Sequence, residues 1–157
     1  MTSNPIRVAI VGIGNCASAL VQAVDLYGKA PSVALPDGLI FERIGSFGVD
    51  DIQIVAAFDV HAQKVGVDLA DAIFVPPNNT YEFSAPPPSG VIVQRGPTLD
   101  GIGAFLQDVV PLSELPPVDV AQVLRDAGVQ VLVNFLPVGS EQATTYYLEQ
   151  ALEAGCA

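Results

Sequence analysis

Four stretches of the chain are apolar at most positions and lack the polar alternation of a half-exposed strand. This pattern is typical of strands buried on both faces of a parallel sheet. The stretches cover residues 6–11, 52–59, 90–93 and 129–136. Between or after them, apolar residues recur with helical spacing over residues 15–26, 63–73, 118–127 and 142–154. The alternation of strands and helices predicts an α/β fold, with a Rossmann-like, doubly wound parallel sheet covered by helices on both faces.

We predict a single domain over residues 1–157, since this length is usual for one hydrophobic core. An insertion at about residues 29–51 separates the first helix from the second strand and is expected to carry a short strand pair. An irregular loop is expected over about residues 75–90, because its five prolines fit neither a helix interior nor a central strand. The last predicted helix has no strand after it, so we expect a sheet that is incomplete at the C-terminus.

The first strand runs directly into a glycine turn and a helix start, in the order that a dinucleotide site requires. The turn sequence Gly-Ile-Gly-Asn-Cys-Ala matches the G-x-G-x-x-G/A fingerprint. Gly12 would make the tight turn, Gly14 would let a pyrophosphate approach the backbone, and Ala17 would let helix and strand pack closely. Asn15 is expected to cap the helix, whose N-terminus would attract a diphosphate without a basic side chain. A turn of this composition also occurs without a ligand. The predicted binding turn comprises Gly12, Ile13, Gly14, Asn15, Cys16 and Ala17.

Asp59 ends the second strand, where a carboxylate can accept hydrogen bonds from the ribose hydroxyls of an adenosine and would repel a 2′-phosphate. This position favours NAD over NADP. Asp59 lies 45 residues after Gly14, against about 20 residues in most such sites, so the assignment depends on the insertion. The alternative is a strand-end aspartate that caps the following helix. His61 and Lys64 follow on the next turn and are expected to be solvated.

Two later turns are predicted to leave the sheet at the same edge, where α/β proteins bind their ligands. The first turn covers residues 94–101, and a solvated turn is the alternative there. Its plausible binding residues are Arg95, Thr98 and Asp100. The second turn, residues 136–141, opens the last helix, with Ser140 or Gly139 at the cap. It would lie beside the glycine turn, where the nicotinamide half of a dinucleotide is usually held.

The charge balance limits the partners of this chain. Seventeen Asp and Glu residues against six Lys and Arg give a net charge of −11, which disfavours nucleic acids and anionic membrane surfaces. Half of the residues are hydrophobic and the mean hydropathy is +0.46, so a covering partner is expected. The chain has neither a signal-peptide pattern nor a run long enough to span a membrane, which predicts a cytoplasmic protein. Cys16 and Cys156 offer no metal-binding pattern, so no metal is expected.

Five ordered sequence blocks resemble the actinobacterial type of myo-inositol-1-phosphate synthases, also called inositol-3-phosphate synthases. The blocks are residues 7–18, 55–59, 64–66 with 71–74, 91–103 and 136–141. The resemblance implies an isomerase that uses NAD and converts D-glucose 6-phosphate to 1D-myo-inositol 3-phosphate by internal oxidation, aldol cyclisation and reduction. It also implies that Gly12 to Ala17 hold the pyrophosphate and that Asp59 holds the ribose. The residues that would flank the nicotinamide side are Thr98, Leu136, Pro137 and Val138.

Members of this family continue well beyond the length of the chain, into a second domain that closes the sheet, carries tetramer contacts and provides catalytic lysines. The resemblance therefore implies the N-terminal, NAD-binding part of a homotetrameric enzyme of inositol and phospholipid biosynthesis. No catalytic residue is assigned within the chain, and residues 1–157 alone are expected to be inactive. One alternative is the NAD-binding domain of a dehydrogenase, for which no Tyr-x-x-x-Lys pair is present. The other is a non-catalytic dinucleotide sensor.

Overall fold

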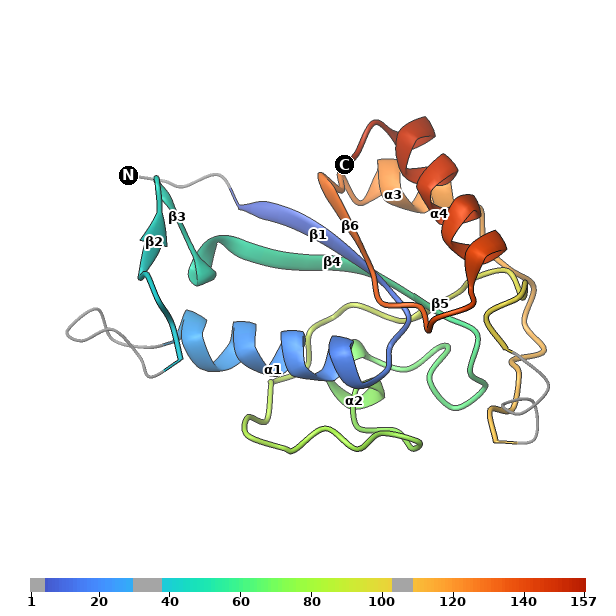
Figure 1. Ribbon diagram of the computed structural model, residues 1–157, viewed down its shortest axis with the longest axis horizontal. Helices are drawn as coiled ribbons and strands as arrows, with labels where there is room; N and C mark the ends of the chain where they lie inside the picture. The colour runs from blue at the N-terminus through green and yellow to red at the C-terminus, as the bar shows by residue number, and fades with distance from the viewer. Residues whose placement is uncertain (1–4, 30–37, 103–108) are drawn as a thin grey trace.

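The structure, a computed structural model, describes residues 5–29, 38–102 and 109–157 (Figure 1). Its main sheet has four parallel strands in the order β5-β4-β1-β6. They are β1 (Ile6–Val11), β4 (Ile52–Asp59), β5 (Gln94–Arg95) and β6 (Val131–Asn134). The strands β4 and β5 are added on one side of β1, and β6 is added on the other side. The order of the strands therefore reverses at β1. In open parallel sheets this change leaves a crevice at the carboxyl ends of the strands.

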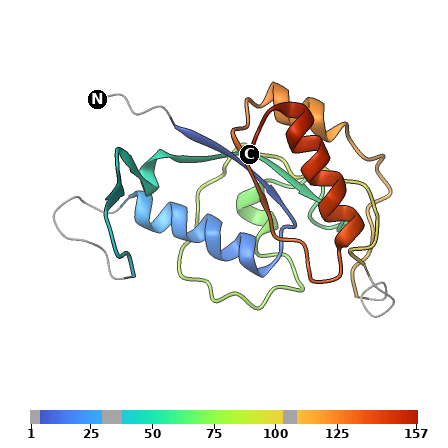
Figure 2. The same ribbon diagram turned by 45° about the horizontal axis from the view of Figure 1, so that its top comes forward.

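Helices cover both faces of the sheet, as Figures 1 and 2 show. One face carries α1 (Asn15–Gly28) and α2 (Leu69–Ala72), and the other carries α3 (Val120–Asp126) and α4 (Glu141–Ala154). In β1, Val8 and Ile10 pack into the core on the α1 side, whereas Ala9 and Val11 pack into the core on the α4 side. A strand that is buried on both faces needs apolar residues at successive positions. The α/β fold class predicted from the sequence is confirmed.

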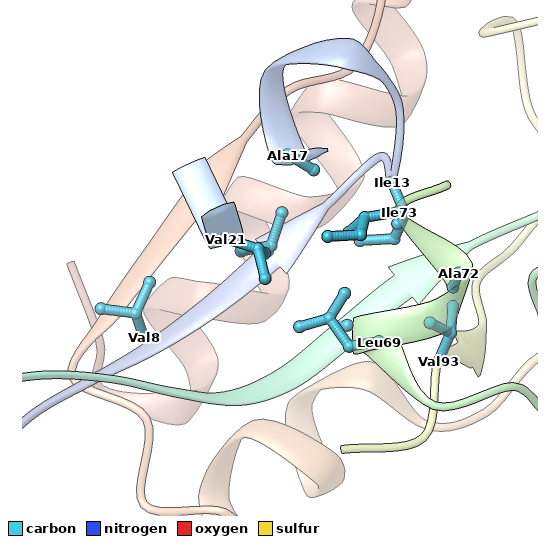
Figure 3. Packing of buried hydrophobic residues seen from close by; sticks show 10 residues of the cluster. Val8, Ile13, Ala17, Val21, Leu69, Ala72, Ile73 and Val93 are labelled. Carbon is cyan, nitrogen blue, oxygen red and sulfur yellow. The ribbon is translucent and has the colours of Figure 1, made fainter. Parts of the chain in front are cut away.

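The core on the α1 side anchors the glycine turn to the rest of the domain. Figure 3 shows Ile13, Ala17 and Val21 packed against Leu69 and Ile73. Ile13 and Ala17 are completely buried. The small Ala17 side chain therefore lies between helix and sheet, in the packing role that the fingerprint predicts.

The segment predicted as an insertion holds a small two-stranded sheet of its own. β2 (Arg43–Ile44) and β3 (Phe47–Gly48) are antiparallel, and the 3-10 helix η1 (Val49–Asp51) follows them. Arg43 pairs with Asp51, with 2.6 Å between Nη2 and Oδ2. The described part of this segment thus carries the short strand pair expected there, while residues 30–37 lie outside the described residues.

Two predicted elements are wrong in their extent. The helix expected over residues 63–73 is reduced to α2, because Gly66 has a φ of +83° and Asp68 caps the helix by accepting a hydrogen bond from Ala70 N. The strand expected over residues 90–93 forms no part of the main sheet. Gly66 N donates to Val93 O and Val93 N donates to Val67 O. This stretch therefore bonds to the turn before α2, and β5 begins one residue later.

Asn15 is the first residue of α1 and does not cap it, contrary to the prediction. Gly14, which has no side chain, occupies the N-cap position instead. Asn15 Oδ1 instead accepts a hydrogen bond from Asn79 N, at 2.8 Å, in the irregular loop over residues 75–90. That loop contains neither helix nor strand, as its prolines predicted. None of the helices in the described part of the chain has the length and apolar character needed to span a bilayer.

Candidate functional site

A cavity of about 430 Å³ lies at the carboxyl edge of the sheet, within the size range of small-molecule and cofactor sites. Nine of the eleven residues predicted for the cofactor line it: Gly12, Ile13, Gly14, Asn15, Cys16, Asp59, Thr98, Leu136 and Pro137. The other two lie outside its lining. Ala17 is buried in the core beneath the turn, and Val138 is fully exposed. The structure therefore brings three turns, far apart in the sequence, to one cavity.

The two glycines of the turn meet different demands. Gly12 has a φ of +83°, and a Cβ atom placed there would lie 3.0 Å from Phe135 O. Only glycine can adopt this positive φ and approach the Phe135 carbonyl this closely without strain. Gly14 has ordinary extended backbone angles, φ −102° and ψ −152°, and no atom would lie within 4 Å of an added Cβ. Gly14 thus leaves open space at the cavity wall.

The start of α1 is available to an anion. Its N-cap residue provides no side-chain hydrogen bond, and its first turn contains no acidic residue. The first N–H groups of a helix lack partners within the helix and carry partial positive charge. Together with the open space at Gly14, this arrangement suits a phosphate group.

Asp59 connects the end of β4 to the glycine turn. Its Oδ2 accepts a hydrogen bond from Ile13 N at 2.7 Å, and its Oδ1 accepts bonds from Val60 N at 2.7 Å and His61 N at 2.8 Å. The carboxylate therefore orders the turn that follows β4 rather than capping a helix. Because two carboxylate oxygens offer about four acceptor positions, Asp59 can still accept a bond from a ribose hydroxyl in the cavity.

His61 and Lys64 are buried, so the prediction that they are solvated is wrong. Lys64 is 4% exposed, and its Nζ donates a hydrogen bond to Ile13 O at 2.6 Å. Burial lowers the pKa of Lys64, and the negative charge of Asp59 opposes this shift. His61 is 3% exposed, and its Nδ1 accepts a bond from Gln63 N at 3.1 Å. Burial and the nearby ammonium of Lys64 lower the pKa of His61.

The turn after β6 has a helix start that is already capped, and the cap comes from a distant residue. Asp100 accepts hydrogen bonds from Gln142 N at 2.7 Å and Ala143 N at 3.0 Å. Ser140 stands at the N-cap position as predicted, but its hydroxyl donates to Pro137 O at 2.7 Å and does not cap α4. The backbone N–H groups of α4, that of Gln142 first, lower the pKa of Asp100.

Arg95, at the end of β5, forms hydrogen bonds within the turn that follows this strand. Arg95 donates to Thr98 Oγ1 at 2.6 Å, to Ser113 O at 3.3 Å and to Gly96 O. Thr98 lines the cavity, whereas Arg95 does not. The guanidinium predicted as a plausible ligand group therefore braces the turn that carries Thr98. Among the described residues, no group of three or more His, Cys, Asp or Glu side chains is arranged to hold a metal ion.

Comparison with known proteins identifies the relatives of this chain, although no protein-family model matches it. It is 54% identical over 155 residues to inositol-3-phosphate synthase of Mycobacterium tuberculosis, across 99% of this chain and 42% of that protein. Over its whole length the chain is related to inositol-3-phosphate synthases. The enzyme of that name from Mycolicibacterium smegmatis is 53% identical over 152 residues, which cover 97% of this chain and 42% of that enzyme.

A solved structure is also similar to this chain. The crystal structure of Ari2 matches with a TM-score of 0.77 and 36% identity, across 98% of this chain and 44% of Ari2. The resemblance inferred from the five sequence blocks is confirmed. The chain spans about two fifths of the length of the curated synthases that it matches.

Sequence reasoning missed Tyr147 as a cavity residue, and it missed the roles that the structure gives to Lys64 and Asp100, although Asp100 was named as a plausible binding residue. Tyr147 of α4 is 3% exposed, lines the cavity and packs against Phe58, with ring centroids 6.0 Å apart; burial raises its pKa. Lys64 and Asp100 act on backbone groups 51 and 42 residues away in the sequence. Only the position of Lys64, five residues after a strand-end acid, offered a sequence signal. The pairing of Asp100 with α4 offered none.

Proposed function

We propose that this chain forms the NAD-binding part of an inositol-3-phosphate synthase, an enzyme that isomerises D-glucose 6-phosphate to 1D-myo-inositol 3-phosphate. The observation that carries the proposal is the cavity between the uncapped start of α1 and the carboxylate of Asp59. One boundary suits a diphosphate and the other suits a ribose. The identity of 54% to a protein named for that activity supports the choice of reaction.

The proposed binding mode assigns one part of the dinucleotide to each wall of the cavity. The pyrophosphate lies over Gly14, against the first N–H groups of α1. Asp59 accepts hydrogen bonds from the adenosine ribose and repels a 2′-phosphate, which selects NAD over NADP. The nicotinamide side lies near Thr98, Leu136 and Pro137, where apolar groups exclude water from the ring.

Bound NAD would supply a hydride acceptor for the sugar and later return the hydride, so that the overall reaction is an isomerisation. The residues of this chain bind and orient the cofactor and keep water away from it. Lys64 is the lysine in the cavity wall, and its ammonium is bonded to Ile13 O. We therefore assign the binding of the sugar phosphate and the acid–base steps to a further part of the synthase. We propose that the whole enzyme is a cytoplasmic homotetramer.

Two measurements test this proposal. Calorimetric titration of the purified protein with NAD and NADP should show tighter binding of NAD. The complete reading frame that encodes this chain, incubated with glucose 6-phosphate and NAD, should yield a product that releases inorganic phosphate after periodate oxidation. Binding of NAD without that product would favour a dehydrogenase domain or a dinucleotide sensor. Absence of NAD binding would exclude all three.

A further inference from the structure

We propose that Lys64 is a positioning residue for the diphosphate of the dinucleotide. By holding the carbonyl group of Ile13, it fixes the direction in which the Gly14 N–H and the start of α1 face the ligand. The inference rests on the proposed function, since it concerns the same cavity. It adds a residue that lies outside the glycine fingerprint and that needs no direct contact with the cofactor.

Ile13 is held from both sides by charged groups. Its N–H donates to Asp59 Oδ2 at 2.7 Å, and its carbonyl accepts from Lys64 Nζ at 2.6 Å. Its side chain is completely buried in the core beneath the turn. Hydrogen bonds to charged groups are shorter and stronger than neutral ones. Neither peptide group next to Ile13 can therefore rotate without breaking a strong bond.

The direction of the Ile13 carbonyl determines the direction of the next N–H. Among the described residues the one cis peptide bond lies between Pro76 and Pro77, so the bond between Ile13 and Gly14 is trans. In a trans peptide, the C=O and the N–H of the same unit point in opposite directions. Because Lys64 draws the Ile13 carbonyl to one side, the Gly14 N–H must point to the other. Gly14 is also the position at which the cavity wall leaves open space.

Packing and stability alone give little reason for a lysine at this buried position. Lys64 is 4% exposed, and a buried charge costs stability unless it is well paired, so an apolar residue would often serve packing equally well. The positive charge of Lys64 would attract a diphosphate that binds nearby. The chain has a net charge of −11, with Lys64 as one of two lysines. A fixed cation beneath the glycine turn would offset part of the repulsion that an anionic ligand meets.

The test compares ligands with and without a diphosphate. In the Lys64→Met variant, which keeps most of the aliphatic side chain, NAD and ADP-ribose should bind about tenfold to a hundredfold more weakly. Adenosine, which lacks the diphosphate, should bind within twofold of its original affinity. Lys64→Arg, which retains a cationic donor, should restore most of the affinity for ADP-ribose.

Lys29→Met is the matched control, because Lys29 is the other lysine of the chain and pairs with Asp25 at the surface. This variant changes the net charge by the same amount as Lys64→Met. It should leave the affinities for NAD, ADP-ribose and adenosine within twofold. A loss of NAD affinity equal to that of Lys64→Met would show that net charge is responsible, and the proposal for Lys64 would fail.

The remaining outcomes separate this inference from the proposed function. If NAD binds Lys64→Met as it binds the original protein, the inference is wrong and the proposed function stands. If adenosine weakens as much as ADP-ribose, Lys64 only supports the fold, and the inference is again wrong. If the original protein binds neither NAD nor ADP-ribose, the proposed function fails and the inference fails with it.

A second measurement needs no variant, in case Lys64→Met does not fold. In the nitrogen-15-labelled original protein, ADP-ribose should shift the amide resonance of Gly14, whereas adenosine should leave it unchanged. A Gly14 amide that responds to neither ligand, or equally to both, would contradict the role assigned to Lys64.

Discussion

The β1–α1 and β6–α4 junctions leave neighbouring strands at the same edge of the sheet, yet their helix starts are opposite in character. At β1–α1, no side chain among the described residues caps the helix, and Gly14 borders open space. At β6–α4, the carboxylate of Asp100 already accepts the N–H groups of Gln142 and Ala143. Both junctions line the cavity. One helix N-terminus is thus free for an anion, and the other is occupied by an anion that the protein provides.

The cavity can orient an asymmetric ligand because its two helix starts differ. A helix N-terminus attracts negative charge only while its N–H groups lack acceptors. The α1 side therefore favours a phosphate, whereas the α4 side presents Leu136, Pro137 and the buried ring of Tyr147. A dinucleotide would place its diphosphate at α1 and its nicotinamide ring near β6.

Filling the open space at Gly14 should remove the ligand and spare the fold. Gly14 has φ −102°, outside the left-handed region that requires glycine, and an added Cβ meets no atom within 4 Å. The branched side chain of Gly14→Val would occupy the expected position of the pyrophosphate, so NAD affinity should fall by about a hundredfold or more. Calorimetric titration and a thermal melt of the same sample check both parts.

Gly12 provides the matched contrast within the same turn. Gly12→Ala should destabilise the fold by about 1–3 kcal/mol, because its φ of +83° disfavours a side chain and the new Cβ would lie 3.0 Å from Phe135 O. Denaturant unfolding measures this loss. Normal NAD binding by Gly14→Val would mean that the ligand lies elsewhere, and the contrast between the two junctions would lose its functional meaning.

The next effect concerns the choice between NAD and NADP. Asp59 lines the cavity with a carboxylate, and a second negative charge on the 2′-phosphate would have to be buried beside it. NAD should bind about tenfold more tightly than NADP. Asp59→Asn, which keeps an oxygen acceptor for Ile13 N, should bring the two affinities close together. Equal affinities in the original protein would remove Asp59 from the ribose site.

The sequence predicted those features that depend on neighbouring residues. Apolar runs located β1, β4 and β6, and the glycine fingerprint located the turn between β1 and α1. Such features follow from local backbone preference and from burial on both faces of the sheet. Nine of the eleven predicted cofactor residues line one cavity because the carboxyl ends of parallel strands share an edge.

The sequence could not reveal contacts between turns that meet only in the folded chain. Lys64 looked like a solvated residue on a polar turn, and its bond to Ile13 depends on how the segment after β4 folds beneath the glycine turn. Asp100 caps α4 across 42 residues. The shortened α2 has the same origin, since the turn before it bonds to Val93 rather than continuing a helix. These interactions are long-range, and local spacing carries no record of them.

A smaller effect should appear at Cys16, which is exposed and lines the cavity at the start of α1. A diphosphate bound there would cover the thiol, so saturating NAD should slow alkylation of Cys16 by iodoacetamide severalfold. Cys156 is buried and serves as the internal control. Peptide mass spectrometry of the alkylated protein distinguishes the two thiols. An alkylation rate of Cys16 that ignores NAD would place the ligand away from the open helix start.

The smallest effect should come from opening the second helix start. Asp100→Ala removes the carboxylate that caps α4, so the melting temperature should fall by roughly 2–4 °C. NAD affinity should change less than twofold, because the proposed diphosphate position lies at α1. The paired measurements are a thermal melt and a NAD titration. A marked loss of NAD affinity with little change in melting temperature would show that Asp100 serves the ligand rather than α4.

The stabilisation of the fold by Asp100 should depend on pH, and the direction of this dependence follows from its pKa. Hydrogen bonds from α4 lower the pKa of Asp100 in the folded state, whereas in the unfolded chain the carboxyl titrates near its ordinary value of about 3.9. A group with a lowered folded-state pKa contributes its full stabilisation above the unfolded-state value and loses it as the pH falls through the folded-state value. The original protein should therefore be more stable than Asp100→Asn at neutral pH, and the difference should shrink below about pH 4. Melting curves of both proteins between pH 7 and pH 3 measure this, and a difference that stays constant across that range would exclude the ionised carboxylate as the cap of α4.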